Sequence, residues 1–209
     1  MWPGPAAERL QASEEVHYPG ARALADVDIT LDRDQCLRDM ALGSATWRPA
    51  KAAGIDDQAL SRLRTACNEY YQEYLRTEAI DIEGVVETLA ELSKHVHMAI
   101  VTTSKRADLE VIHEKRQICK SVDFALARED FTLAKPHPEP CLTGLKRFGA
   151  TREETPVMED SSRGLASAAA AGIDCVIVHN GFTKMQDFSQ AIRRTEALGE
   201  LKNIVLDVS

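Results

Sequence analysis

The sequence has no long apolar run, no basic stretch and no closely spaced cysteines. No segment approaches the roughly 20 consecutive apolar residues that cross a bilayer. Residues 1–10 carry prolines and a glutamate where a secretory signal has basic and then apolar residues. The net charge of -8, from 33 acidic and 25 basic residues, argues against binding to nucleic acid or anionic membrane. We therefore expect a cytoplasmic protein with no nucleic-acid or membrane partner.

The five cysteines are scattered, odd in number and free of any CxxC pair. This pattern is typical of unpaired thiols in a reducing compartment. No two cysteines or histidines have the spacing of zinc ligands, so we expect no zinc site. At 209 residues and 44% hydrophobic content, the chain can form one good core with a small insert or cap.

The first half of the chain is expected to be irregular and then helical. Prolines and glycines in residues 1–20, including Pro19 and Gly20, are expected to break any helix or strand. Residues 21–40 can be helical in parts, with a turn around 32–34. Apolar residues recur at three and four residues over 56–77, which predicts a long amphipathic helix with Asp56 or Asp57 as N-cap.

The second half alternates short apolar strands with helices. Strands are expected at 97–101, 122–126, 157–158, 175–178 and 203–206, and helices at 83–93, 107–115, 140–148 and 163–171. This alternation predicts an α/β fold with a Rossmann-like parallel sheet sandwiched by helices. Ligands bind outside the carboxyl ends of the strands in such sheets. The residues that follow each strand are therefore the candidate site.

Two of these positions suit a phosphate group. Thr102 and Thr103 directly follow the strand at 97–101, and a strand-end hydroxyl can bind a phosphate oxygen, although it can equally be a local cap. Lys135 stands in Ala-Lys-Pro-His-Pro, where Pro136 keeps it out of the helical region. A lysine on so rigid a loop can neutralise phosphate, or it can be an ordinary surface lysine. His137 is expected only to fill the loop.

A third position suits a metal. Glu159 and Asp160 are adjacent carboxylates at the end of a strand, and they repel each other unless a cation lies nearby. Magnesium takes one or two protein carboxylates and keeps several waters. The alternative is an aspartate N-cap with a solvated glutamate. Gly164 and the alanines after it favour the metal interpretation, because they let the following helix pack closely beneath the site.

In order and spacing, the strand-end threonine, Lys-Pro and EDSSRGLASAAAAGI resemble the second to fourth motifs of the haloacid dehalogenase-like superfamily. The resemblance runs from about residue 81 to 180 and is greatest to the phosphoglycolate phosphatase and β-phosphoglucomutase branch. It implies a helical cap over 21–79 on an α/β core over 80–209, after an irregular 1–20. It also implies that Thr102 and Lys135 are catalytic, that Thr103 helps to bind substrate, and that Glu159 and Asp160 bind Mg²⁺.

The first motif of that superfamily, an Asp-x-Asp pair that supplies the nucleophile, has two possible placements. Asp26 and Asp28 match the bare pattern, but Ile29 replaces the usual glycine and residues 20–25 make a poor buried strand. The favoured alternative places Asp26 in the cap. The aspartates then fall near Pro5 and Ala7, and the first core strand and its nucleophile are missing through degeneracy, truncation or a shifted reading frame.

Three functions remain open at this point. The first is a Mg²⁺-dependent phosphatase that acts on a small phosphorylated metabolite through an aspartyl-phosphate. The second is an impaired relative that binds phosphate esters, Mg²⁺ or a protein partner without turnover, and the third is a structural role for the cap helices. Haloacid dehalogenation is less expected, because it needs no metal. The sequence leaves the substrate and the oligomeric state open.

Overall fold

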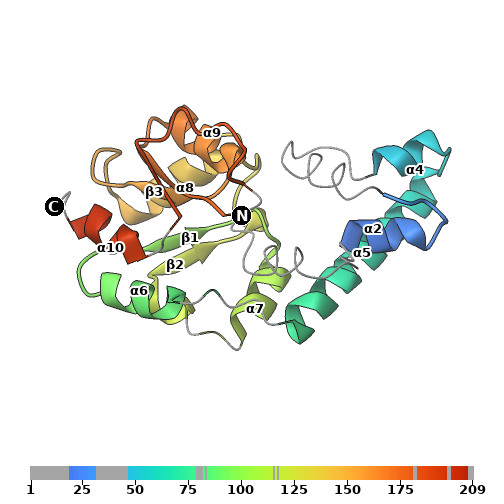
Figure 1. The fold of residues 1–209 in the computed structure, drawn as a ribbon, viewed down its shortest axis with the longest axis horizontal. Coiled ribbons are helices and arrows are strands. Elements are labelled where there is room, and N and C mark those ends of the chain that lie inside the picture. The colour runs from blue at the N-terminus through green and yellow to red at the C-terminus, as the bar shows by residue number, and fades with distance from the viewer. Residues whose placement is uncertain are drawn as a thin grey trace. The chain divides into compact units, whose positions relative to one another are not determined.

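A computed structural model describes residues 19–31, 47–78, 82, 84–114, 116, 118–180, 183–196 and 199–206 (Figure 1). The chain divides into two compact units. One lies within residues 6–79 and is helical where it is described. The other contains residues 80–209 and is built from parallel strands and helices. The expected irregular segment at 1–18 and the turn at 32–34 lie outside the described residues.

The helical unit contains α2 (Pro19–Ala25), α4 (Arg48–Ala52) and α5 (Asp57–Thr77). Asp56 is the N-cap of α5, as predicted, and its side chain accepts a hydrogen bond from the Ala59 backbone N–H at 2.7 Å. The apolar stripe of α5 buries Leu60 and Leu63 in a cluster with Leu24 of α2. This small core explains why α2 and α5 pack on each other.

The expectation that Pro19 and Gly20 interrupt secondary structure is wrong. Both residues belong to α2, which begins at Pro19. A proline is tolerated in the first turn of a helix, because an N–H at that position has no partner within the helix. Gly20 is one of the buried residues of α2.

The described residues of the α/β unit form five parallel strands in two sheets. These are β1 (Ala99–Val101) with β2 (Phe124–Leu126), and β3 (Val157–Glu159), β4 (Cys175–Val178) and β5 (Arg193–Thr195) in that order. No described strand joins the two sheets. The helices are α6 (Val85–Leu92), α7 (Arg106–Glu114), α8 (Glu139–Phe148), α9 (Ser162–Ala171) and α10 (Gly199–Leu206), with short 3₁₀ turns at η1 (Ile118–Ser121) and η2 (Arg128–Asp130).

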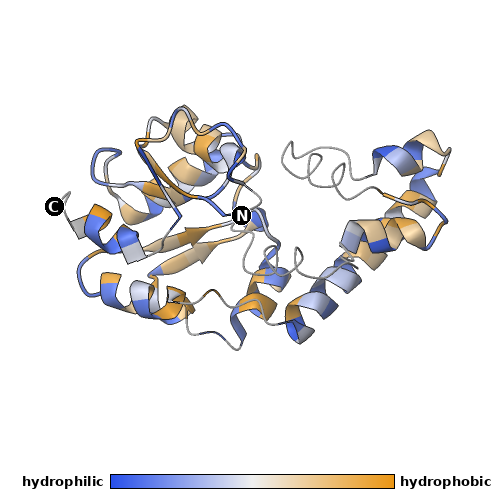
Figure 2. Ribbon diagram, viewed as in Figure 1, coloured by the Kyte–Doolittle hydropathy of each residue, from blue (hydrophilic) through white to orange (hydrophobic). Residues whose placement is uncertain are grey.

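β4 is buried on both faces, which is why it reads as a continuous apolar run. The strands β1 and β2 are also coloured as apolar in Figure 2. Cys175 and Ile177 point into a cluster with residues of α8 and α9. Val176 and Val178 point to the opposite face, where Leu201 and other residues of α10 cover them. This sandwich matches the predicted Rossmann-like α/β architecture.

The expectation for the end of the chain is wrong, and one strand before it was missed. The predicted strand at 203–206 is part of helix α10, in which Leu201 and Ile204 are spaced three residues apart and face the sheet. The last strand is instead β5, which the sequence did not reveal because two of its three residues are exposed arginines. None of the described helices combines the length and apolar character that crossing a bilayer requires.

Candidate active site

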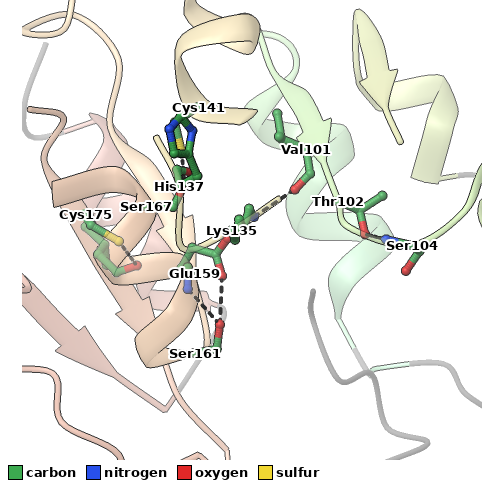
Figure 3. Close-up of polar contacts among 12 residues, drawn as sticks. Val101, Thr102, Ser104, Lys135, His137, Cys141, Glu159, Ser161, Ser167 and Cys175 are labelled. Carbon is green, nitrogen blue, oxygen red and sulfur yellow. Dashed lines mark hydrogen bonds and ion pairs between the residues drawn. The ribbon is translucent and has the colours of Figure 1, made fainter. Parts of the chain in front are cut away.

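Lys135 links the carboxyl ends of β1 and β3, which belong to different sheets (Figure 3). Its ammonium group donates to the carbonyl of Val101, the last residue of β1, at 2.9 Å. It also forms an ion pair with Oε1 of Glu159, the last residue of β3. Each of these two charged side chains is only 5% exposed. The positive charge is therefore buried between two strand ends.

Thr102 and Thr103 directly follow Val101, whose carbonyl accepts from this ammonium group. The Thr102 backbone N–H donates to the Leu126 carbonyl at 2.9 Å, which fixes its position against β2. Its hydroxyl oxygen accepts the Ser104 N–H at 3.1 Å, so Thr102 does cap the turn locally. The hydroxyl proton can still be donated to a ligand. The Thr103 hydroxyl is buried and has no hydrogen-bond partner among the described residues.

Asp160 directly follows Glu159 and is 1% exposed. Neither carboxylate oxygen accepts a hydrogen bond from another described residue. Burial, and then the neighbouring Glu159 charge, raise the pKa of Asp160 to about 7. A buried carboxylate without partners is costly, and a cation that binds there would remove that cost.

The pKa of Glu159 is shifted in the opposite direction. Burial by itself would raise its pKa, but the pKa of Glu159 lies below its ordinary value, and the charge and hydrogen bond of Lys135 are among the causes. Its other oxygen, Oε2, accepts the Ser161 hydroxyl at 3.4 Å (Figure 3). Glu159 is therefore a charged carboxylate with a fixed orientation. Its neighbour Asp160 takes up a proton near pH 7.

Asp160 is not the N-cap of α9. Ser161 is the N-cap, and its hydroxyl accepts the Gly164 N–H at 3.1 Å. Gln186, from the loop after β4, accepts the Ser162 N–H at 2.7 Å. Because these two side chains serve the helix terminus, the alternative role of Asp160 as an N-cap is not what the structure shows.

The donor set suits magnesium better than a transition metal. Glu159 and Asp160 supply only carboxylate oxygens, and Mg²⁺ is commonly bound by one or two carboxylates with several waters. Within the described part of the chain, no group of three or more His, Cys, Asp or Glu side chains could hold a metal ion. The unpartnered oxygens of Asp160 are the observation that fits a cation.

Three supporting residues were not anticipated from the sequence. The Glu139 carboxylate and the Ser167 hydroxyl bond to the backbone of the segment that carries Lys135, and Gln186 bonds to the turn after Asp160. His137 accepts the Glu139 N–H through Nδ1 at 3.1 Å, so it takes part in starting α8. No sequence motif indicated these roles, because each depends on the path of a loop.

Asp26 and Asp28 lie in the helical unit. Asp26 follows the last residue of α2 and accepts the Tyr70 hydroxyl at 2.8 Å. Asp28 has a φ of 59°, a left-handed conformation that aspartate tolerates in turns. Neither residue follows a strand. The structure thus brings Thr102, Lys135, Glu159 and Asp160 to strand ends of the α/β unit, and places Asp26 and Asp28 at the end of a helix.

Comparison with known proteins adds a family and a fold. The haloacid dehalogenase-like hydrolase model matches residues 30–178. A phosphoglycolate phosphatase from Photorhabdus laumondii is 28% identical over 66% of this chain and 58% of its own length. Protein CbbY from Rhodobacter capsulatus is 27% identical over 70% of this chain and 67% of its own. The chain thus spans about half to two thirds of the curated relatives it matches.

Solved structures show the same fold. CbbY from Rhodobacter sphaeroides, in complex with phosphate, superimposes with a TM-score of 0.73 at 19% identity and covers 88% of this chain and 87% of its own. A hydrolase from Pseudomonas syringae gives a TM-score of 0.70 at 21% identity, with 92% of each chain covered. At these identities the likeness establishes the α/β fold and nothing about the substrate.

Proposed function

The chain belongs to the haloacid dehalogenase-like hydrolase family, and from this premise we propose that it acts on the phosphoryl group of a small phosphorylated metabolite with the help of Mg²⁺. One observation carries the proposal: Lys135, which is paired with Glu159, is buried at the strand ends beside Asp160, whose oxygens have no partner among the described residues. Buried titratable groups with perturbed pKa values are concentrated at functional sites. The names of the matched relatives, among them phosphatases, agree with this substrate class.

Each residue of the site has a role that its position suits. Lys135 supplies a fixed positive charge for the phosphoryl oxygens, and the hydroxyls of Thr102 and Thr103 supply hydrogen bonds to them. Glu159 keeps the ammonium group of Lys135 oriented through their ion pair. The helical residues 21–79 are proposed to form a cap that excludes water from the bound metabolite.

Glu159 and Asp160 are the residues that would hold Mg²⁺. When bound, the ion would neutralise phosphoryl oxygens and the two adjacent carboxylates. Asp160 would be charged in that state, because a neighbouring cation opposes the burial that raises its pKa. The resulting affinity for Mg²⁺ is expected to increase with pH through the titration range of Asp160.

Hydrolysis through an aspartyl-phosphate needs one more group, a carboxylate that attacks phosphorus. Asp26, with Asp28 as proton donor to the leaving group, fits this chemistry only in one of the two sequence registers. Residues 1–25 of the chain contain no aspartate, so no earlier candidate exists in this sequence. The identity of the nucleophile is therefore the decisive question for catalysis.

A second function is favoured by a specific contact. Asp26 is bonded to Tyr70 at the end of α2 and does not stand after a strand. This suits a structural aspartate in the cap, as the other register has it. In that case the chain would bind Mg²⁺ and a phosphate ester without turning the ester over.

Turnover of p-nitrophenyl phosphate with Mg²⁺ distinguishes the two functions. The hydrolase proposal predicts activity in the parent protein that Asp26→Asn abolishes, while Asp57→Asn, an exposed aspartate at the start of α5, leaves it unchanged. Activity that survives Asp26→Asn would rule out Asp26 as nucleophile. No turnover, together with an increase in melting temperature on addition of Mg²⁺ that Asp160→Asn removes, would support binding without hydrolysis.

A further inference from the structure

The segment that carries Lys135 is held at its beginning by Glu139. The carboxylate of Glu139 accepts the backbone N–H groups of Thr132 and Leu133, each at 2.8 Å. These two bonds, in that order, hold the pKa of Glu139 below its ordinary value, so the group is a charged acceptor. Because Glu139 starts α8, it fastens residues 132–133 to the helix that follows them.

The same segment is held near its end by Ser167. This side chain is fully buried on α9, and its hydroxyl donates to the His137 carbonyl at 2.7 Å (Figure 3). The other buried residues of α9 are apolar or glycine, so Ser167 is the polar exception on that face. Ser167 therefore binds the backbone two residues beyond Lys135.

Lys135 needs this support because its ammonium group has two fixed partners. The Val101 carbonyl lies 2.9 Å away and Glu159 forms the ion pair. A small displacement of the segment would break both contacts and leave two buried charges without compensation. Pro136 and Pro138 restrict the local backbone, but they do not determine where the segment lies against α8 and α9.

We infer that Glu139 and Ser167 are positioning residues that hold Lys135 in the site. We call these two residues the Lys135 clamp. The inference rests on the proposed function only for the role of Lys135 as a phosphoryl ligand. The effect of the Lys135 clamp on the position of the lysine can be tested without any ligand.

Chemical acetylation of lysines by acetic anhydride in the intact chain, followed by peptide mass spectrometry, measures how well the ammonium group of Lys135 is protected. Lys135 should react slowly in the parent protein, and Lys146, an exposed lysine on α8, provides the internal reference. We expect Glu139→Ala to raise the rate at Lys135 at least about tenfold, equal to about 1.4 kcal/mol of local opening. Glu139→Gln should give an intermediate rate, because its amide oxygen can accept one of the two bonds.

The chain offers a matched control in Glu154. This carboxylate also accepts a backbone N–H and a hydroxyl, both from Thr151, at 3.0 and 2.8 Å, and its pKa is likewise lowered by these bonds. Glu154→Ala should leave the rate at Lys135 unchanged. Ser167→Ala, which removes one oxygen atom, should raise the rate at Lys135. If Glu139→Ala does not fold, Ser167→Ala and Glu139→Gln together test the Lys135 clamp.

Two results would overturn the clamp. One is a rate at Lys135 that stays within about twofold of the parent in the folded clamp variants, which is under about 0.5 kcal/mol. The other is an equal increase in Glu154→Ala. A separate experiment adds Mg²⁺ and inorganic phosphate to the parent protein. Slower acetylation of Lys135 supports the proposed function, and an unchanged rate counts against it. The comparison of variants tests the Lys135 clamp in either case.

Discussion

Gly164 packs so closely against the Glu159 carboxylate that a Cβ atom at position 164 would overlap with its carboxyl group. Position 164 lies in the first turn of α9, and Glu159 ends β3. The absence of a side chain therefore lets the helix begin directly behind the carboxylate pair. This contact gives a physical reason for glycine in the Glu-Asp-Ser-Ser-Arg-Gly motif.

Gly164→Ala is predicted to disturb the site and the fold together. The added methyl group must displace Glu159 or α9, and overpacking of this kind costs about 1–3 kcal/mol of unfolding free energy. Binding of Mg²⁺, followed by the increase in melting temperature, should weaken as well. Gly149→Ala is the control. An alanine at a φ of 69° also lowers the stability of the fold, but no atom lies within 4 Å of the new Cβ, so Mg²⁺ binding should persist.

The carboxyl of Asp160 should make the Mg²⁺-free protein less stable as pH rises. Its pKa in the folded state, about 7, lies above the ordinary value of 3.8, so the folded state binds more protons than the unfolded state between these values. The stabilisation is complete below about pH 4 and is lost as pH rises through 7. Each unit of pKa shift corresponds to about 1.4 kcal/mol.

Urea unfolding between pH 4 and 8 measures this dependence. Asp160→Asn should flatten it, because an amide does not titrate. Asp187→Asn should retain it, because the pKa of Asp187 is lowered by its bonds to Ser189 and contributes no slope above pH 4. An unchanged slope in Asp160→Asn would show that another group is responsible.

The ion pair of Lys135 and Glu159 is predicted to be strongly coupled. Lys135→Met or Glu159→Gln alone leaves one buried charge without its partner, which costs about 3–5 kcal/mol. The double variant removes both charges and should cost less than the sum of the two. Additive losses in urea unfolding would contradict the pairing. The exposed pair of Lys94 and Glu91, at 2.6 Å, is the comparison and should show far weaker coupling.

Asp26 is predicted to control the titration of Tyr70. The hydrogen bond to Asp26, together with partial burial and the charge of Asp26, raises the pKa of Tyr70. Asp26→Asn should therefore lower that pKa toward its ordinary value, as followed by NMR of the tyrosine ring carbons. A Tyr70 pKa that does not respond would contradict the hydrogen bond between Asp26 and Tyr70.

Sequence patterns predicted the site residues whose role is indicated by the residues next to them in the chain. Lys135 stood out because prolines surround it, and Glu159 and Asp160 because two carboxylates follow an apolar strand. Features that depend on loop paths were not predictable. Glu139 reaches back seven residues, and Ser167 is hidden in an alanine-rich helix. The strand expected at 203–206 is the second half of helix α10, since a short apolar run has no clear period.

Binding of inorganic phosphate, measured by isothermal titration calorimetry with and without Mg²⁺, tests the central claim most directly. The account predicts that the parent protein binds phosphate in the presence of Mg²⁺, and that Lys135→Met and Asp160→Asn each weaken this binding at least about tenfold, or about 1.4 kcal/mol. Lys146→Met, on the exposed side of α8, should bind as the parent does. Equal binding by Lys135→Met and the parent, or no binding in any condition, would contradict it.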